Sequence, residues 1–271
     1  MNILEKIVTH KNREVAERKA MYPVELLEKS IYFETPVVSL SKYLRRADRL
    51  GIIAEFKRRS PSKGDINPYA SVEKVSIGYM QAGASALSVL TDTAFFGGKS
   101  EDLTEARKYN FCPILRKDFV VDEYQLVEAR SIGADAVLLI AECLEKKQLA
   151  QLARTAKGLG LEVLMEAHSA RQLDKYTPDV DAVGINNRNL EDFSVSLAAS
   201  LELITELPAE AVKVSESGLD DPNAVVELRR AGYQGFLIGE YFMRHADPGK
   251  ACRELIHRVQ HIEALLNNTI A

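Results

Sequence analysis

Short apolar runs and helix-like stretches alternate along this chain, and this alternation constrains the fold most. The apolar runs are rich in the residues that strands favour, and they lie at 52–56, 86–90, 113–115, 136–140, 161–165, 182–185, 212–214 and 235–238. Helical patterns follow them at 71–82, 101–108, 122–132, 145–159, 170–176, 197–207, 222–231 and 249–266. Strict alternation implies a parallel sheet with right-handed crossovers, and eight units predict an α/β fold of the closed (β/α)8 TIM barrel type.

An open, doubly wound sheet is the alternative arrangement. It is less favoured, because no Gly-x-Gly-x-x-Gly turn follows the first strand and no break in composition divides the strands into two halves. Residues 1–48 precede the barrel and have amphipathic helical patterns. We therefore expect an N-terminal helical extension, residues 1–48, that packs on the floor or the mouth of a catalytic barrel formed by residues 49–271.

Composition excludes several classes of partner. The 271 residues carry a formal net charge of -4 without a block of Lys or Arg, so we expect a small-molecule ligand rather than nucleic acid or a membrane surface. The three cysteines show no CxxC spacing, which indicates reduced thiols rather than a disulfide framework or a zinc site. Charges interrupt the N-terminal apolar residues, and no apolar run approaches the roughly 20 residues of a spanning helix. A cytoplasmic protein is the expectation.

Polar side chains stand where the predicted strands end. On the first strand, Ile53, Glu55 and Lys57 share one face because side chains alternate along a strand. The corresponding residues of the other strands are Thr91, Asp92, Lys117, Asp118, Glu166, Asn186, Arg188, Glu216 and Glu240. Since the carboxyl ends of barrel strands meet on one rim, the pattern predicts a single site there.

Glycines follow the last two strands. Ser217-Gly218 and Gly239 stand where backbone N–H groups can approach an anion closely, and barrel enzymes often bind a substrate phosphate in these loops. The pattern favours a phosphorylated substrate.

Four stretches carry a resemblance to a known family. They read IAEFKRRSPS at 53–62, PILRKDF at 113–119, GINNRNL at 184–190 and VSESG at 214–218. In these stretches, and over essentially its whole length, the chain resembles indole-3-glycerol phosphate synthases of tryptophan biosynthesis. The resemblance implies a phosphosugar substrate, 1-(2-carboxyphenylamino)-1-deoxyribulose 5-phosphate. It also implies the reaction, which is ring closure onto the ketone carbon, loss of carbon dioxide and loss of water.

The resemblance also implies roles for the catalytic residues. Lys117 matches the general acid, and we expect burial and a neighbouring Lys57 to lower its pKa towards neutrality. Lys57 would also pair with the substrate carboxylate, and Glu55 would orient either ammonium group. Glu166 matches the base of the dehydration step, and Asn186 would hydrogen-bond the substrate hydroxyls.

Further residues would bind the substrate. An apolar slot for the aromatic ring is matched by Phe96, Phe119, Leu138 and Leu190, with Pro61 at its edge. Ser60 would hydrogen-bond the carboxylate side of the ring. Arg188 would stabilise the charges of the rim. Ser217 would bind substrate, and Gly218, Gly239 and Glu240 would bind the phosphate. Glu240 stands where other members carry Ser, so we expect only its backbone N–H to contact the phosphate and its side chain to turn away. The chain has no Trp, and Tyr22 or Phe33 would replace an aromatic residue that some members contribute from the N-terminal helix.

We expect no metal and no cofactor. The five histidines lack the spacing of metal ligands, although His168, two residues after Glu166, would be placed to tune that carboxylate. The expected assembly is a monomer or a weak homodimer.

Two other functions are consistent with a phosphosugar barrel. A sister isomerase would use an Asp/Cys acid–base pair and would not need both Lys57 and Lys117. A phosphosugar-binding protein without activity would keep the glycines but would not need Lys117 together with Glu166.

Overall fold

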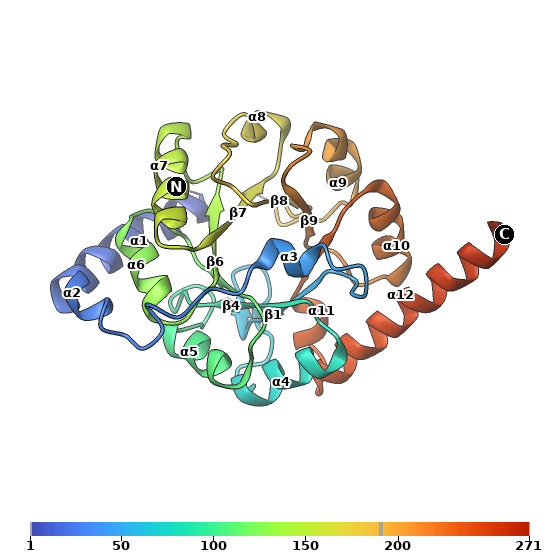
Figure 1. Cartoon of the computed structure of the whole chain (residues 1–271), viewed down its shortest axis with the longest axis horizontal. Helices are drawn as coiled ribbons and strands as arrows, with labels where there is room; N and C mark the ends of the chain where they lie inside the picture. Colours follow the sequence, from blue (N-terminus) through green and yellow to red (C-terminus); the bar gives the residue numbers. More distant parts are fainter. Residues whose placement is uncertain (1, 190–191, 271) are drawn as a thin grey trace.

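Eight parallel strands close into a barrel, as the alternation predicts. The structure is a computed structural model that describes residues 2–189 and 192–270. Strand β1 pairs with β4 on one side and with β10 on the other, and the remaining strands follow in chain order (Figure 1). The barrel strands are β1 (Ile52–Phe56), β4 (Ala86–Leu90), β5 (Ile114–Lys117), β6 (Ala136–Ile140), β7 (Glu162–Ala167), β8 (Ala182–Asn186), β9 (Val212–Glu216) and β10 (Gly235–Ile238). A two-stranded hairpin, β2 (Arg59–Ser60) with β3 (Gly64–Asp65), follows β1.

The predicted helices surround the barrel. They are α4 (Val72–Ala82), α5 (Ser100–Tyr109), α6 (Tyr124–Ser131), α7 (Lys146–Gly158), α8 (Ala170–Leu173), α9 (Ala198–Leu203) with the 3₁₀ turn Ile204–Glu206, α10 (Pro222–Ala231) and α12 (Pro248–Ile270). Helix α8 ends at Leu173, three residues earlier than predicted. A short helix that the sequence analysis did not predict, α11 (Glu240–Met243), lies between β10 and α12.

Two apolar clusters explain the strand pattern. Ile53, Leu115 and Leu164 belong to a cluster inside the barrel, whereas Ile52, Ala54 and Phe56 pack outward with the surrounding helices. Because side chains alternate, Glu55 shares the inner face with Ile53, as predicted. Four predicted strand ends are too early: β5, β7, β8 and β9 continue through Lys117, Ala167, Asn186 and Glu216. Their polar residues continue the ladder because they find partners in the mouth of the barrel.

The N-terminal segment reaches both ends of the barrel. Helix α1 (Ile3–Met21) contacts α6, as does α2 (Val24–Leu27), and Lys11 pairs with Asp92 and Asp118 beyond the carboxyl ends of β4 and β5. Helix α3 (Leu40–Leu44) closes the opposite end, where Leu40 and Leu44 join the inner cluster (Figure 1). The segment therefore contributes to the mouth as well as to the floor.

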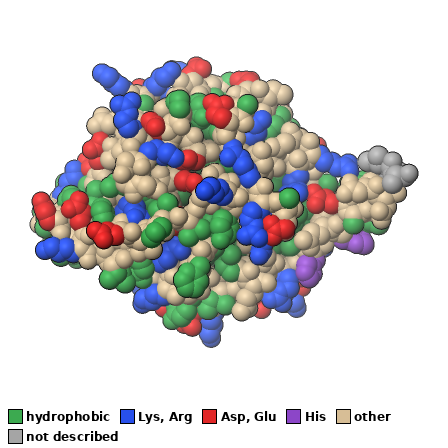
Figure 2. Space-filling view, viewed as in Figure 1, with side chains coloured by type: hydrophobic (Ala, Val, Ile, Leu, Met, Phe, Trp, Pro, Cys, Tyr) green, Lys and Arg blue, Asp and Glu red, His purple; other side chains and the backbone are tan. Residues whose placement is uncertain are grey.

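The surface is mixed in charge. On the face crossed by α3, Lys and Arg side chains are interspersed with Asp and Glu (Figure 2). None of the helices in the described ranges combines the length and the hydropathy needed to cross a membrane.

Candidate active site

A cavity of about 550 Å³ opens at the carboxyl ends of the strands. Leu190, predicted for the apolar slot, lies outside the described residues. The other residues predicted for catalysis or substrate binding line this cavity: Glu55, Lys57, Ser60, Pro61, Phe96, Lys117, Phe119, Leu138, Glu166, Asn186, Arg188, Ser217, Gly218, Gly239 and Glu240. Thr91 and Asp92, which were also predicted at the rim, lie outside its described lining. Residues from all eight barrel strands and the loops that follow them thus converge on one space.

Lys117 stands between two carboxylates. Its Nζ lies 2.9 Å from Glu166 Oε2 and 2.7 Å from Glu216 Oε2. The Asn186 amide donates to the other oxygen of Glu166 at 2.9 Å. Since 13% of the Lys117 side chain remains exposed, a ligand in the cavity can reach the ammonium group.

The pKa of Lys117 contradicts the expectation from sequence. Burial acts to lower this pKa, but Glu166, Glu216 and Glu55 outweigh it and raise the pKa above its ordinary value. Lys57 does not counteract them, because its Nζ is paired with Glu55 Oε1 at 2.7 Å. The prediction was wrong because carboxylates from three strands surround the ammonium group.

The two carboxylates beside Lys117 differ in pKa. Burial acts to raise the pKa of Glu166, but Lys117, His168 and the Asn186 hydrogen bond lower it to about 2. Burial and the charges of Glu166 and Glu55 raise the pKa of Glu216 to about 7, against the opposing effect of Lys117. At neutral pH the site therefore has a firmly ionised carboxylate on one side of Lys117 and a titrating one on the other.

Glu216 was expected at the rim, but without a role in the chemistry. The signal that identifies it is strand alternation: Val212 and Val214 lie in the inner cluster, so Glu216 faces inward as well. Gly184 on the neighbouring strand leaves room for it, because a Cβ there would lie 2.2 Å from Glu216 Oε1.

His168 lies behind Glu166. Its Nε2 is 3.6 Å from Glu166 Oε1, and neither ring nitrogen has a hydrogen-bond partner among the described residues. This position is consistent with the expected tuning of Glu166.

Gly239 makes room for Glu55. A Cβ at Gly239 would lie 2.3 Å from Glu55 Oε1 and 2.9 Å from its Cβ, closer than such atoms approach in proteins. The glycine after β10 therefore makes room for the Glu55 side chain, whatever its predicted contact with the phosphate.

Aromatic and aliphatic side chains form one wall of the cavity. The rings of Phe96 and Phe119 lie with their centroids 5.9 Å apart. The cavity lining also includes Ile3, Leu4 and Ile7 of α1, which sequence analysis missed. Tyr22 and Phe33, the suggested aromatic substitutes, were the wrong choice: neither belongs to the described lining, and Phe33 packs under the guanidinium of Arg130.

The rim opposite this wall is charged. Ser217 and Gly218 are both left-handed, with φ of 68° and 74°, and a Cβ at Gly218 would lie 2.4 Å from Val195. The Glu240 carboxylate pairs with Arg188 at 3.1 Å and lies 3.7 Å from Lys63. It thus has two cationic neighbours at the edge of the cavity.

The site is built from acid–base groups. Within residues 2–189 and 192–270, no group of three or more His, Cys, Asp or Glu side chains is arranged to hold a metal ion. The arrangement of Lys117, Glu166 and Glu216 suits proton transfer to and from a ligand.

Comparison with known proteins identifies the family. The family model for indole-3-glycerol phosphate synthase matches residues 4–255. Indole-3-glycerol phosphate synthase of Bacteroides thetaiotaomicron is 47% identical over 259 residues, which cover 96% of this chain and 99% of that protein. The enzyme of the same name from Laribacter hongkongensis is 42% identical, covering 94% of this chain and 98% of its own length.

Two solved structures share the fold at low sequence identity. A thiamine phosphate pyrophosphorylase from Pyrococcus furiosus superposes with a TM-score of 0.59 at 17% identity, covering 83% of this chain and 99% of that one. A structure described as native KDPGal gives 0.55 at 15% identity, covering 82% and 97%. The fold is common to these barrels, whereas the family match extends over nearly the whole chain. The chain belongs to the indole-3-glycerol phosphate synthase family.

Proposed function

We propose that the protein converts 1-(2-carboxyphenylamino)-1-deoxyribulose 5-phosphate to indole-3-glycerol phosphate by ring closure, decarboxylation and dehydration. One observation carries the proposal. A partly exposed lysine, Lys117, lies within 3 Å of two buried carboxylates at the base of a cavity with an apolar wall and a charged rim. The three steps need an acid, a base and a place for each end of the substrate.

In the first step, Lys117 donates a proton to the ketone oxygen as the ring carbon attacks. Lys57 pairs with the substrate carboxylate, and Glu55, 2.7 Å from Lys57 Nζ, holds that ammonium in place. Carbon dioxide then leaves, which restores the aromatic ring.

In the second step, Glu166 takes a proton from the ring-closed intermediate, and the Lys57 ammonium, released when the carboxylate leaves as carbon dioxide, gives the departing hydroxyl its proton so that water leaves. The positive charge of Lys117 is the main reason why the pKa of Glu166 is low, and burial opposes it. When Lys117 has given its proton to the substrate, that charge is gone, and the pKa of Glu166 must rise. The carboxylate therefore becomes a better base after ring closure, which is when dehydration requires one.

The two ends of the substrate bind on opposite walls. The aromatic ring enters the slot formed by Phe96, Phe119, Leu138 and Pro61, and Ser60 hydrogen-bonds the carboxylate side. Asn186 binds the hydroxyls, and the phosphate lies at the backbone N–H groups of Gly218, Gly239 and Glu240, beside Ser217 and Arg188. We place the reaction in the cytoplasm and expect a monomer or a weak homodimer.

Glu216 is expected to set the pH dependence of the acid step. While Glu216 is protonated, it places no negative charge beside Lys117 to hold the Lys117 proton, and it returns a proton to Lys117 after Glu166 has acted as the base. Because its pKa lies at about 7, we expect kcat to fall as pH rises through about 7. Glu216→Gln should remove this fall in kcat above about pH 7. It should also lower kcat about 10²-fold at pH 6, since an amide returns no proton to Lys117. Steady-state measurements of kcat from pH 5.5 to 9 check this. If kcat of the variant still falls as pH rises through about 7, another group is responsible for the pH dependence.

An indole fluorescence assay with purified protein and a chelator tests the function itself. Growth of the product signal is the expected result. If the signal is absent while the protein stays folded, two further assays separate the alternatives. Formation of the same phosphosugar from phosphoribosylanthranilate would indicate the sister isomerase, and binding without turnover would indicate a binding protein.

A further inference from the structure

Lys11 on α1 is a lysine without solvent exposure. Burial of an ammonium group is costly unless several acceptors surround it. Its Nζ lies 3.0 Å from each of three carboxylate oxygens, on Asp92, Asp118 and Glu14. Asp118 and Asp92 raise the pKa of Lys11 although burial opposes them, so the group is a permanent cation.

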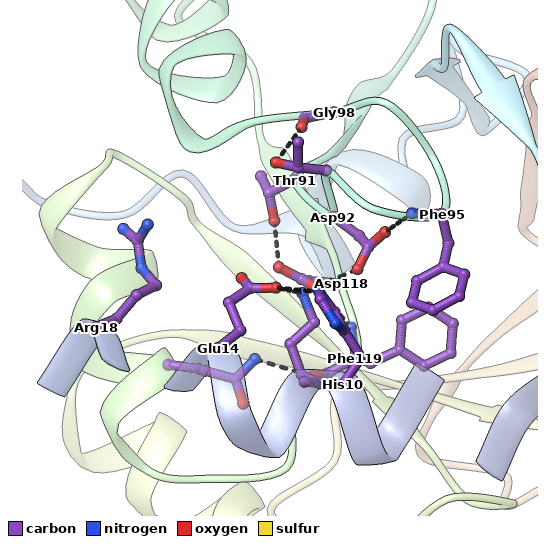
Figure 3. Close-up of polar contacts among 12 residues, drawn as sticks. His10, Glu14, Arg18, Thr91, Asp92, Phe95, Gly98, Asp118 and Phe119 are labelled. Atoms are coloured by element: carbon purple, nitrogen blue, oxygen red, sulfur yellow. Dashed lines mark hydrogen bonds and ion pairs between the residues drawn. The ribbon is translucent and has the colours of Figure 1, made fainter. Parts of the chain in front are cut away.

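Both aspartates also hold the loops from which they come. Asp92 Oδ1 accepts the backbone N–H groups of Phe95 and Phe96, at 2.7 and 3.2 Å. Asp118 accepts the N–H of Phe119 at 2.8 Å and the hydroxyl of Thr91 at 2.6 Å. Figure 3 shows Asp92 and Asp118 side by side above α1, with Asp92 directed at the backbone nitrogen of Phe95. Lys11 thus joins the loops that carry the two cavity aromatics.

The same face of α1 reaches the cavity. Ile3, Ile7 and Lys11 recur every four residues and so lie along one side of the helix. Ile3 and Ile7 line the cavity, whereas Lys11 lies outside its lining. Two other ion pairs, Arg18 with Glu128 and Lys19 with Asp122, hold the C-terminal half of α1 against the β5–α6 region. The Lys11 cluster therefore acts on the half of α1 that forms the cavity wall.

We propose that Lys11 is a positioning residue that clamps the first half of α1 to the loops after β4 and β5 and thereby fixes the apolar wall for the aromatic ring of the substrate. The inference rests on the proposed function for its substrate. Lys11 does not touch the ligand, so its effect is on how well the wall is formed.

Lys11→Met in the full chain tests the clamp. We expect KM for the phosphosugar to rise about 10- to 100-fold, because misplacement of a binding wall has effects of this size. Inhibition by inorganic phosphate, which probes the opposite rim, should stay unchanged. Lys19→Met is the matched control: it removes an ion pair of the same helix, 2.7 Å long but exposed, and should leave both constants as they are.

A second variant separates positioning from folding. Lys11→Met leaves the buried Asp92 and Asp118 without their common cation, and this unpaired charge opposes folding. Lys11→Met/Asp92→Asn removes one negative charge while the Asn oxygen still accepts from Phe95 and Phe96. We expect the double variant to fold like the wild type and to keep the raised KM. Compared with the wild type, its backbone amides should exchange hydrogen faster at residues 3–10 but not at residues 14–21.

Each result decides one question. A folded double variant with wild-type KM and wild-type exchange would overturn the clamp. Wild-type protein that forms no indole product would overturn the proposed function instead, and the exchange measurement would still decide whether Lys11 holds α1.

Discussion

Replacement of Lys117 with alanine is expected to lower kcat by about 10³-fold or more, with a change in substrate affinity of less than about tenfold. The ammonium group is the proton donor for ring closure in the proposed mechanism, and it lies within 3 Å of both Glu166 and Glu216. Steady-state kinetics together with equilibrium binding of the phosphosugar measure the two effects separately.

Lys117→Arg separates charge from acidity. The guanidinium keeps the positive charge between Glu166 and Glu216, but it does not release a proton near neutral pH. We expect this variant to fold and to bind, yet to be as slow as Lys117→Ala. Wild-type rates in either variant would contradict the acid assignment, and normal kcat with a raised KM would make Lys117 a binding contact only.

The architecture of the barrel follows from sequence because it depends on local patterns. Alternation places Ile53 and Glu55 on one face, and the structure has them there. Predicted strands end too early where polar residues such as Asn186 and Glu216 continue the ladder. Their polarity suggests a loop, and only the assembled rim supplies the partners that keep them in the strands.

Protonation behaviour could not be predicted in the same way. The pKa values of Lys117 and Glu216 depend on charges from β1, β5, β7 and β9, which are separated by long stretches of sequence. The sequence points to burial and Lys57 as the influences on the pKa of Lys117, which gives the wrong sign for the shift. The clearance at Gly239 for Glu55 is likewise a property of two strands that meet only when the barrel closes.

The N-terminal segment shows a further limit. Its amphipathic pattern predicts packing on the barrel but not which end it contacts, because both ends offer apolar surface. The structure uses different helices for the two ends, and buried charge marks the contact at the mouth: Lys11 pairs there with Asp92 and Asp118. From sequence alone, a lysine on an amphipathic helix is expected to be exposed to solvent, because the carboxylates that surround it come from distant parts of the chain.

Glu166→Gln is expected to lower kcat about 10²- to 10³-fold by slowing dehydration more than ring closure. The amide takes no proton from the substrate, so the second step loses its base. In this variant Lys117 still has Glu216 at 2.7 Å but no longer has the negative charge of Glu166 beside it. Because that charge raises the pKa of Lys117, its loss lowers the pKa of Lys117, and Lys117 can still donate the proton for ring closure. A ring-closed species that has lost carbon dioxide but not water should therefore accumulate in a single turnover.

Quenched single-turnover reactions followed by mass spectrometry detect that species. Glu162→Gln provides the control, because Glu162 begins the same strand at the opposite end of the barrel, where it accepts hydrogen bonds from Ser39 and Ser41. This change should reduce stability without causing the intermediate to accumulate. If Glu166→Gln accumulates only unreacted substrate, Glu166 acts in ring closure. Its hydrogen bonds to Lys117 and Asn186 would then serve to orient the acid rather than to hold a base in place.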